Sequence, residues 1–81
     1  MNSNQIEIQL LNSIDNVIGV EVVKLDDDTY QVYVRTTDTE IEELYDSVGR
    51  RVHYDSSSDY NQRELKQKVD LVMIRSLKGE N

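Results

Sequence analysis

The chain has 81 residues, enough for one domain (residues 1–81) and too few for two. It contains no cysteine and no proline, which excludes disulfide bonds and cysteine metal sites. Hydrophobic residues make up 37% of it, without Phe or Trp, so we expect a small core of aliphatic side chains and tyrosines.

The net charge of −7 is unevenly distributed. Residues 1–49 contain eleven acids and two bases, a net −9, whereas residues 50–81 contain five acids and seven bases, a net +2. An acidic surface repels nucleic acid and anionic lipid and attracts basic protein surfaces. Direct nucleic-acid binding is not expected, because nucleic-acid-binding domains are usually strongly basic. The alternative is that the charge only keeps a small protein soluble.

A helix is predicted near the N-terminus. Apolar residues recur at three- and four-residue spacing between Ile6 and Ile18, Ser3 or Asn4 would cap the start, and Gly19 would stop the helix. Residues 6–8 also alternate between apolar and polar, so a strand there is the alternative.

The clearest predicted element is a β-hairpin. Residues 20–25 form a β-rich run, and residues 30–35 alternate strictly between two faces. One face would contain Tyr30, Val32 and Val34, and the other Gln31, Tyr33 and Arg35. The turn between the strands would contain Asp26, Asp27 and Asp28.

Residues 38–55 fit two interpretations. Three features indicate a helix. Thr39 and Glu42 fit a capping box, and Gly49 fits a C-terminal stop. The apolar stripe between them would consist of Ile41, Leu44, Tyr45 and Val48. Residues 45–50 also resemble a hairpin loop between strands at 40–45 and 50–54. We favour this second hairpin, because an isolated two-stranded hairpin is only marginally stable and additional strands would support it.

A C-terminal helix is predicted to begin at Asp59, with Gln62 three residues further on. Its buried stripe would consist of Leu65, Val69, Val72, Met73 and Leu77. Leu71 and Ile74 fall outside this stripe. Either the helix is buried on two sides, or it offers a second apolar strip to a partner, or residues 69–74 form a strand. The predicted fold is therefore α+β, a four-stranded antiparallel sheet of two hairpins flanked by an N-terminal and a C-terminal helix, in the order αββββα.

No pattern of catalytic or metal-binding residues is found. His53 is the sole histidine and falls in a predicted strand, and the three consecutive aspartates lack the spacing of a calcium loop. The serines match no nucleophile motif, and the glycines lie far apart. We expect no enzymatic activity and no cofactor.

The first residues lack a basic start and an apolar run, so no signal peptide is expected. The longest apolar run, residues 71–74, is far shorter than the ~20 residues of a membrane span. We expect a cytoplasmic protein without a membrane partner.

The leading functional hypothesis is a small acidic protein-binding module, in particular an inhibitor that blocks a basic, nucleic-acid-binding site on a partner protein by charge mimicry. Tyr33 belongs to the predicted binding surface because tyrosine is enriched in protein interfaces. In size and charge, but in no motif, the chain is similar to small acidic inhibitors carried by phages, anti-CRISPR proteins among them. The predicted partner-binding residues are Asp26, Asp27, Asp28, Tyr33, Asp38, Glu40, Glu42, Glu43 and Asp46.

The alternative is a structural or regulatory subunit that assembles through apolar contacts as a homo-oligomer, such as a homodimer. Leu71 and Ile74 would form its interface. The two hypotheses differ in salt dependence, because exposed charges are screened by salt and buried apolar surface is not.

Overall fold

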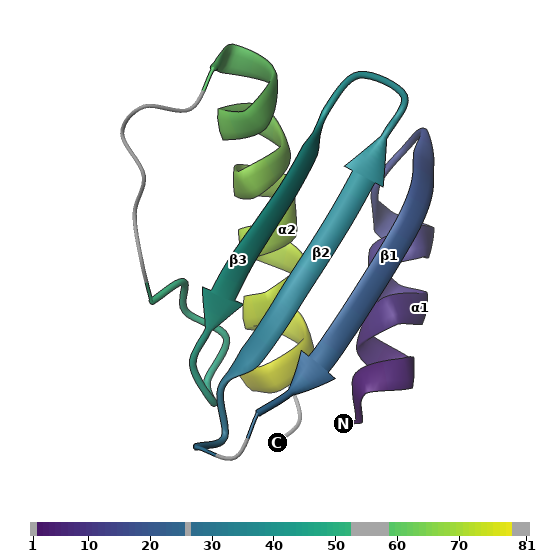
Figure 1. The fold of residues 1–81 in the computed structure, drawn as a ribbon. Helices are drawn as coiled ribbons and strands as arrows, with labels where there is room; N and C mark the ends of the chain where they lie inside the picture. Colours follow the sequence, from purple (N-terminus) through teal and green to yellow (C-terminus); the bar gives the residue numbers. More distant parts are fainter. Residues whose placement is uncertain (1, 26, 53–58, 79–81) are drawn as a thin grey trace.

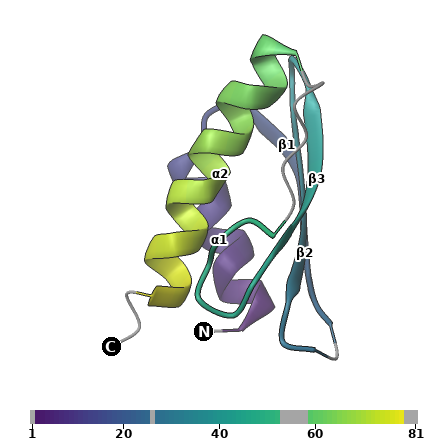
Figure 2. The same cartoon turned by 90° about the vertical axis from the view of Figure 1, so that its left-hand side faces the viewer.

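The computed structural model describes residues 2–25, 27–52 and 59–78. Its elements follow in the order α1 (Ser3–Ser13), β1 (Val17–Lys24), β2 (Tyr30–Thr36), β3 (Glu40–Tyr45) and α2 (Tyr60–Lys78). The strands form one antiparallel sheet in the order β1-β2-β3 (Figure 1). Both helices lie against the same face of this sheet, so the fold has two layers (Figure 2). The α+β class is confirmed.

The predicted four-stranded sheet and the order αββββα are wrong. The first strand of the second hairpin exists as β3, and its turn forms, with Asp46 N donating to Arg50 O at 2.8 Å. Beyond the turn, pairing within the described residues is limited to one bridge, Tyr45 with Arg51, and one bond, from Val52 N to Leu44 O at 2.9 Å. The rest of the predicted strand, residues 53 and 54, lies outside the described residues.

The position of Arg51 gives a physical reason for the short pairing. Its guanidinium forms an ion pair with Asp70 of α2 at 3.3 Å, so the chain after the turn is tied to the helix. The turn itself lies beside α2 in Figure 2. The helical alternative for residues 38–48 is also excluded, because residues 40–45 form β3.

Helix α1 is capped by Asn2, one residue before Ser3, the earlier of the two predicted caps. Asn2 Oδ1 accepts from Gln5 N at 2.9 Å, and Gln5 Oε1 accepts from Asn2 N at 3.0 Å, a reciprocal capping box. The helix ends at Ser13 rather than near Gly19. Asn16, with a φ of 64°, takes the left-handed conformation between the helix and β1.

The core lies between the helices and the covered face of the sheet. As predicted, the covered face of β2 consists of Tyr30, Val32 and Val34, and α2 buries Leu65, Val69, Val72 and Met73. The other buried hydrophobic side chains are Ile6, Leu10, Ile14, Val22, Ile41 and Tyr45. Residues 69–74 are helical throughout, which excludes the strand alternative. Asp59 caps α2 as expected, accepting from Gln62 N at 2.8 Å.

Gly49 allows the turn after β3 to approach the backbone of α2. Its φ of +91° belongs to the left-handed region. A Cβ at this position would overlap the carbonyl oxygen of Met73 and lie 2.9 Å from Ile74 Cα. Because these are backbone atoms of a helix, they cannot move aside without distorting it.

We therefore expect Gly49→Ala to lower the free energy of unfolding by about 2–4 kcal/mol, from overpacking and backbone strain together. Gly19→Ala is the matched control, because a Cβ there would lie 3.8 Å from the side chains of Arg35 and Tyr33. The control should change stability by no more than about 0.5 kcal/mol. Urea unfolding followed by circular dichroism measures both, and equal effects would contradict the close approach.

Candidate protein-binding surface

The face of the sheet opposite the helices is uncovered by any helix or strand that the structure describes (Figure 2). The strand register arranges its side chains in three rows across the sheet, which are Val23–Gln31–Leu44, Glu21–Tyr33–Glu42 and Gly19–Arg35–Glu40. We call these nine residues the open face. Gly19, Gln31 and Tyr33 are half-buried by their neighbours, and the other six are exposed.

Tyr33 lies at the centre of the open face. Its ring atom Cε2 is 3.8 Å from the position that a Cβ on Gly19 would occupy, so the ring lies beside the glycine. Its hydroxyl donates to Glu40 Oε2 at 3.3 Å. The tyrosine is therefore held by contacts to β1 on one side and β3 on the other.

Glu21 and Glu42 flank Tyr33 in the same row. Their Cα atoms are separated by two strand spacings, roughly 9.6 Å. Within the part of the chain that the structure describes, neither carboxylate has a hydrogen bond or an ion pair. Both carboxylates are therefore exposed charges that no described residue neutralises.

The predicted acidic residues do not gather in one patch. Glu40 and Glu42, two of the residues predicted to bind a partner, lie on the open face with Tyr33, and so does Glu21, which is not in that predicted set. Asp38 lies in the turn between β2 and β3, at the end of the sheet away from Asp27 and Asp28. Asp26 lies outside the described residues.

Three of the predicted aspartates have contacts within their own turns. Asp27 Oδ1 accepts from Thr29 Oγ1 at 2.6 Å, and this hydrogen bond lowers the pKa of Asp27. Asp28 lies 3.5 Å from the ammonium of Lys24. Asp46 Oδ1 accepts from the backbone N–H groups of Val48 and Arg50 at 3.1 and 2.9 Å. These carboxylates stabilise the turns at one end of the sheet.

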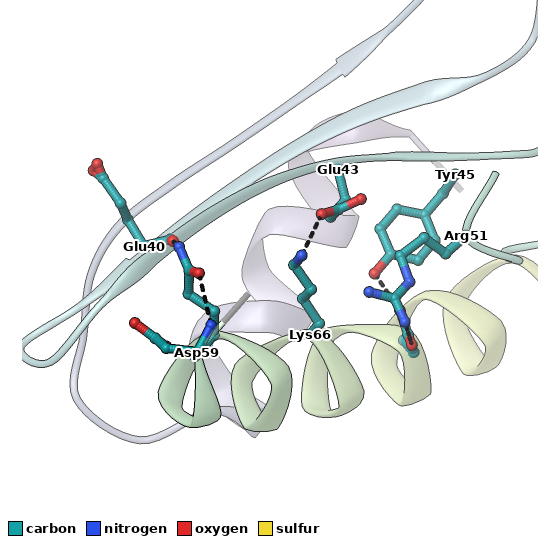
Figure 3. A network of polar contacts seen from close by, with 8 residues as sticks. Glu40, Glu43, Tyr45, Arg51, Asp59 and Lys66 are labelled. Carbon is teal, nitrogen blue, oxygen red and sulfur yellow. Dashed lines mark hydrogen bonds and ion pairs between the residues drawn. The ribbon is translucent and has the colours of Figure 1, made fainter. Parts of the chain in front are cut away.

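Glu43, predicted to bind a partner, lies on the covered face instead. Its carboxylate is 3.0 Å from Lys66 Nζ, and the two side chains are only 8% and 6% exposed (Figure 3). A buried carboxylate needs a cationic or hydrogen-bonded partner, because leaving water is unfavourable for an ion. Glu43 therefore joins β3 to α2 and is unavailable to a docking protein.

A second, partly buried polar contact lies beside this ion pair. The hydroxyl of Tyr45 donates to Asp70 Oδ1, and the other oxygen of Asp70 accepts from Arg51 Nη2 at 3.3 Å (Figure 3). Burial, followed by the hydrogen bond to the Asp70 carboxylate, raises the pKa of Tyr45 far above its usual value. We call Glu43, Lys66, Tyr45, Asp70 and Arg51 the polar joint, since they connect β3, the following turn and α2.

Both edges of the sheet have backbone groups that are already hydrogen-bonded. On β1, Val22 N donates to Glu7 Oε2 at 2.8 Å. On β3, Glu40 O accepts from Gln62 Nε2 at 3.4 Å and Leu44 O accepts from Val52 N at 2.9 Å. These bonds occupy groups that an added strand would need. Both edges are therefore less open to strand addition than unbonded edges would be.

A separate cleft of about 200 Å³ lies between the end of α1, the β2–β3 turn and the first half of α2. Its polar lining includes Asp15, Asn16, Asp38, Asn61 and Lys68. It is smaller than the ≈ 300–1,000 Å³ of typical small-molecule sites. Among the described residues, no group of three or more acidic or histidine side chains is arranged to hold a metal ion. The cleft gives no basis for assigning a ligand.

Comparison of the chain with protein-family models, with curated proteins and with solved structures finds no significant match. In addition, neither α1 nor α2, as far as they are described, combines the length and hydropathy needed to cross a membrane.

The buried Tyr45 hydroxyl predicts a loss of stability at alkaline pH. Above about pH 10 an unfolded tyrosine loses its proton, whereas the folded state retains it, so the free energy of unfolding should fall as pH rises. Tyr45→Phe should lower this free energy by about 1.5–3 kcal/mol at neutral pH, because a hydrogen bond to a charged group is lost. The difference in the free energy of unfolding between Tyr45→Phe and wild type should shrink between about pH 10 and about pH 11, because only wild type has the Tyr45 hydroxyl that ionises on unfolding. Urea unfolding across this range measures it, and a constant difference would refute the assignment.

Proposed function

We propose that the chain is a small protein-binding module whose open face docks against a basic surface of a partner protein. The observation that supports this most directly is the row Glu21–Tyr33–Glu42, in which two exposed carboxylates without a partner in the described chain flank a half-buried tyrosine. Tyrosine is enriched at protein interfaces, and complementary charge accelerates association and favours the correct partner.

The adjoining row adds apolar contact area. Val23 and Leu44 are 42% and 37% exposed, and they lie on either side of Gln31. Protein interfaces commonly combine an apolar centre with a polar rim. The open face thus offers charge, an aromatic ring and aliphatic surface within three neighbouring rows.

The charge density of the open face favours a general basic protein surface over strict mimicry of nucleic acid. The part of β2 between Gln31 and Arg35 spans roughly 13 Å, a length over which double-stranded DNA carries roughly eight charges. The open face has three carboxylates opposed by Arg35. Inhibition of a nucleic-acid-binding site is the narrower form of the proposal, and it would require the acidic turns at both ends of the sheet to extend the charged region.

A pair of charge-matched variants tests the proposal. E21Q/E42Q removes two negative charges from the open face, and D27N/D28N removes two from the β1–β2 turn. A partner retained by wild type and by D27N/D28N at about 0.1 M salt should be lost with E21Q/E42Q, and about 0.5 M salt should release it, because the Debye length falls below 10 Å. Affinity capture from cells that produce the protein, followed by binding measurements with the purified partner, provides the readout.

Equal loss of binding in both double variants would mean that only net charge matters, and would contradict docking through the open face. Retention of the partner by E21Q/E42Q at both salt concentrations would contradict it as well. Nuclease treatment of the lysate ensures that nucleic acid does not bridge the two proteins.

A second candidate function, self-assembly through α2, is favoured by one observation. Leu71 and Ile74 are 56% and 38% exposed, and they lie three residues apart on the helix. Two side chains provide much less than the ≈ 800 Å² that each partner buries in a standard interface, so this candidate ranks second. A dimer that persists at high salt in analytical ultracentrifugation, and disappears in L71S/I74S, would favour it.

A further inference from the structure

We infer that the row Glu21–Tyr33–Glu42 recognises an arginine side chain of the partner. This inference rests on the proposed function and specifies the chemistry that the partner presents to the open face. It follows from the spacing of Glu21 and Glu42 across the sheet, the fixed position of the Tyr33 ring, and the residues of the adjoining rows.

The two carboxylates lie on opposite sides of Tyr33, with Cα atoms roughly 9.6 Å apart. A guanidinium has five N–H donors in one plane, so a single arginine placed over the row can donate toward both sides. A lysine ammonium is a compact, strongly hydrated point charge and matches this arrangement less well. The geometry therefore favours arginine.

The ring of Tyr33 supplies the third contact. A guanidinium is attracted to the face of an aromatic ring and is more weakly hydrated than an ammonium, so it loses less on leaving water. The ring lies beside Gly19, and its hydroxyl bonds to Glu40, so its position is fixed before binding. A pre-positioned ring lowers the entropy lost when the partner docks.

The adjoining rows define the surroundings of this arginine. Arg35 lies in the neighbouring row, Gly19–Arg35–Glu40. Among the described residues it forms no ion pair with Glu21 or Glu42, so the negative charge of these two carboxylates is not already neutralised. Its own charge disfavours a second cation over that row. Val23 and Leu44 lie on the other side and suit the aliphatic stem of an arginine or an apolar neighbour.

The test uses two capped peptides of equal length and charge, one with three arginines and one with three lysines, each separated by glycine. Titration of ¹⁵N-labelled protein at low salt should shift the amides of Glu21, Tyr33 and Glu42. The arginine peptide should bind roughly two- to five-fold more tightly, the ratio expected for a cation–π contact at an exposed site.

Three variants separate the contributions. Tyr33→Leu should weaken the arginine peptide more than the lysine peptide, and so remove the preference for arginine. E21Q/E42Q should weaken both peptides, and D27N/D28N, with the same change in net charge, should retain the preference. The dispersion of the amide spectrum reports whether each variant is folded. The ratio of the affinities of the two peptides for the wild-type protein tests the preference for arginine without any variant.

Equal binding of both peptides at the open face would overturn the arginine inference and leave the proposed function intact. Shifts confined to the turns, or the absence of binding by either peptide, would overturn both.

Discussion

The buried ion pair between Glu43 and Lys66 allows β3 to turn its apolar residues Ile41 and Tyr45 toward the helices with a carboxylate between them. Side chains alternate along a strand, so β3 buries either Ile41, Glu43 and Tyr45 or Glu40, Glu42 and Leu44. The first choice buries one carboxylate, opposite the lysine of α2, and the second would bury two. Because an unpaired buried charge is destabilising by several kcal/mol, the single carboxylate with a matching lysine is strongly preferred.

This choice has a direct consequence for the other side of the sheet. With Glu43 turned toward α2, Glu40 and Glu42 face outward and align with Tyr33 and with Glu21 of β1. The polar joint therefore helps to orient the surface proposed to bind a partner, although none of its members lies on that surface. The same joint ties the turn after β3 to α2 through Arg51 and Asp70, which limits the sheet to three described strands.

Much of the fold could be predicted from local patterns. The alternation of residues 30–35 gave the correct two faces of β2, and Asp59 with Gln62 gave the start of α2. The predicted fourth strand failed because the contact of Arg51 with Asp70 joins residues far apart in the sequence, which local patterns do not contain. The predicted helix stop at Gly19 was also wrong. Gly19 follows a helix-like apolar stripe in the sequence, but it lies within β1.

The candidate surface was predictable only in part. Tyr33, Glu40 and Glu42 followed from alternation and charge, whereas Glu21 needed the register of β1 against β2. The sequence places Glu43 among the predicted partner-binding acids because acidic residues are frequent throughout its first half. Two signals could have identified it: strict alternation places it beside Ile41 and Tyr45, and Lys66 falls within the buried stripe of α2. Oppositely charged residues on the buried faces of a strand and of the helix packed against it indicate a buried ion pair.

A double-mutant cycle on this pair tests the central claim most directly. The free energy of unfolding is measured for wild type, Glu43→Gln, Lys66→Met and the double variant. If the pair fixes β3, each single change should be destabilising by about 3–5 kcal/mol. The decrease in the free energy of unfolding in the double variant should then be at least about 2 kcal/mol smaller than the sum of the decreases in the two single variants. Additivity within about 0.5 kcal/mol would show that the two charges act independently, and that the burial of β3 does not depend on them.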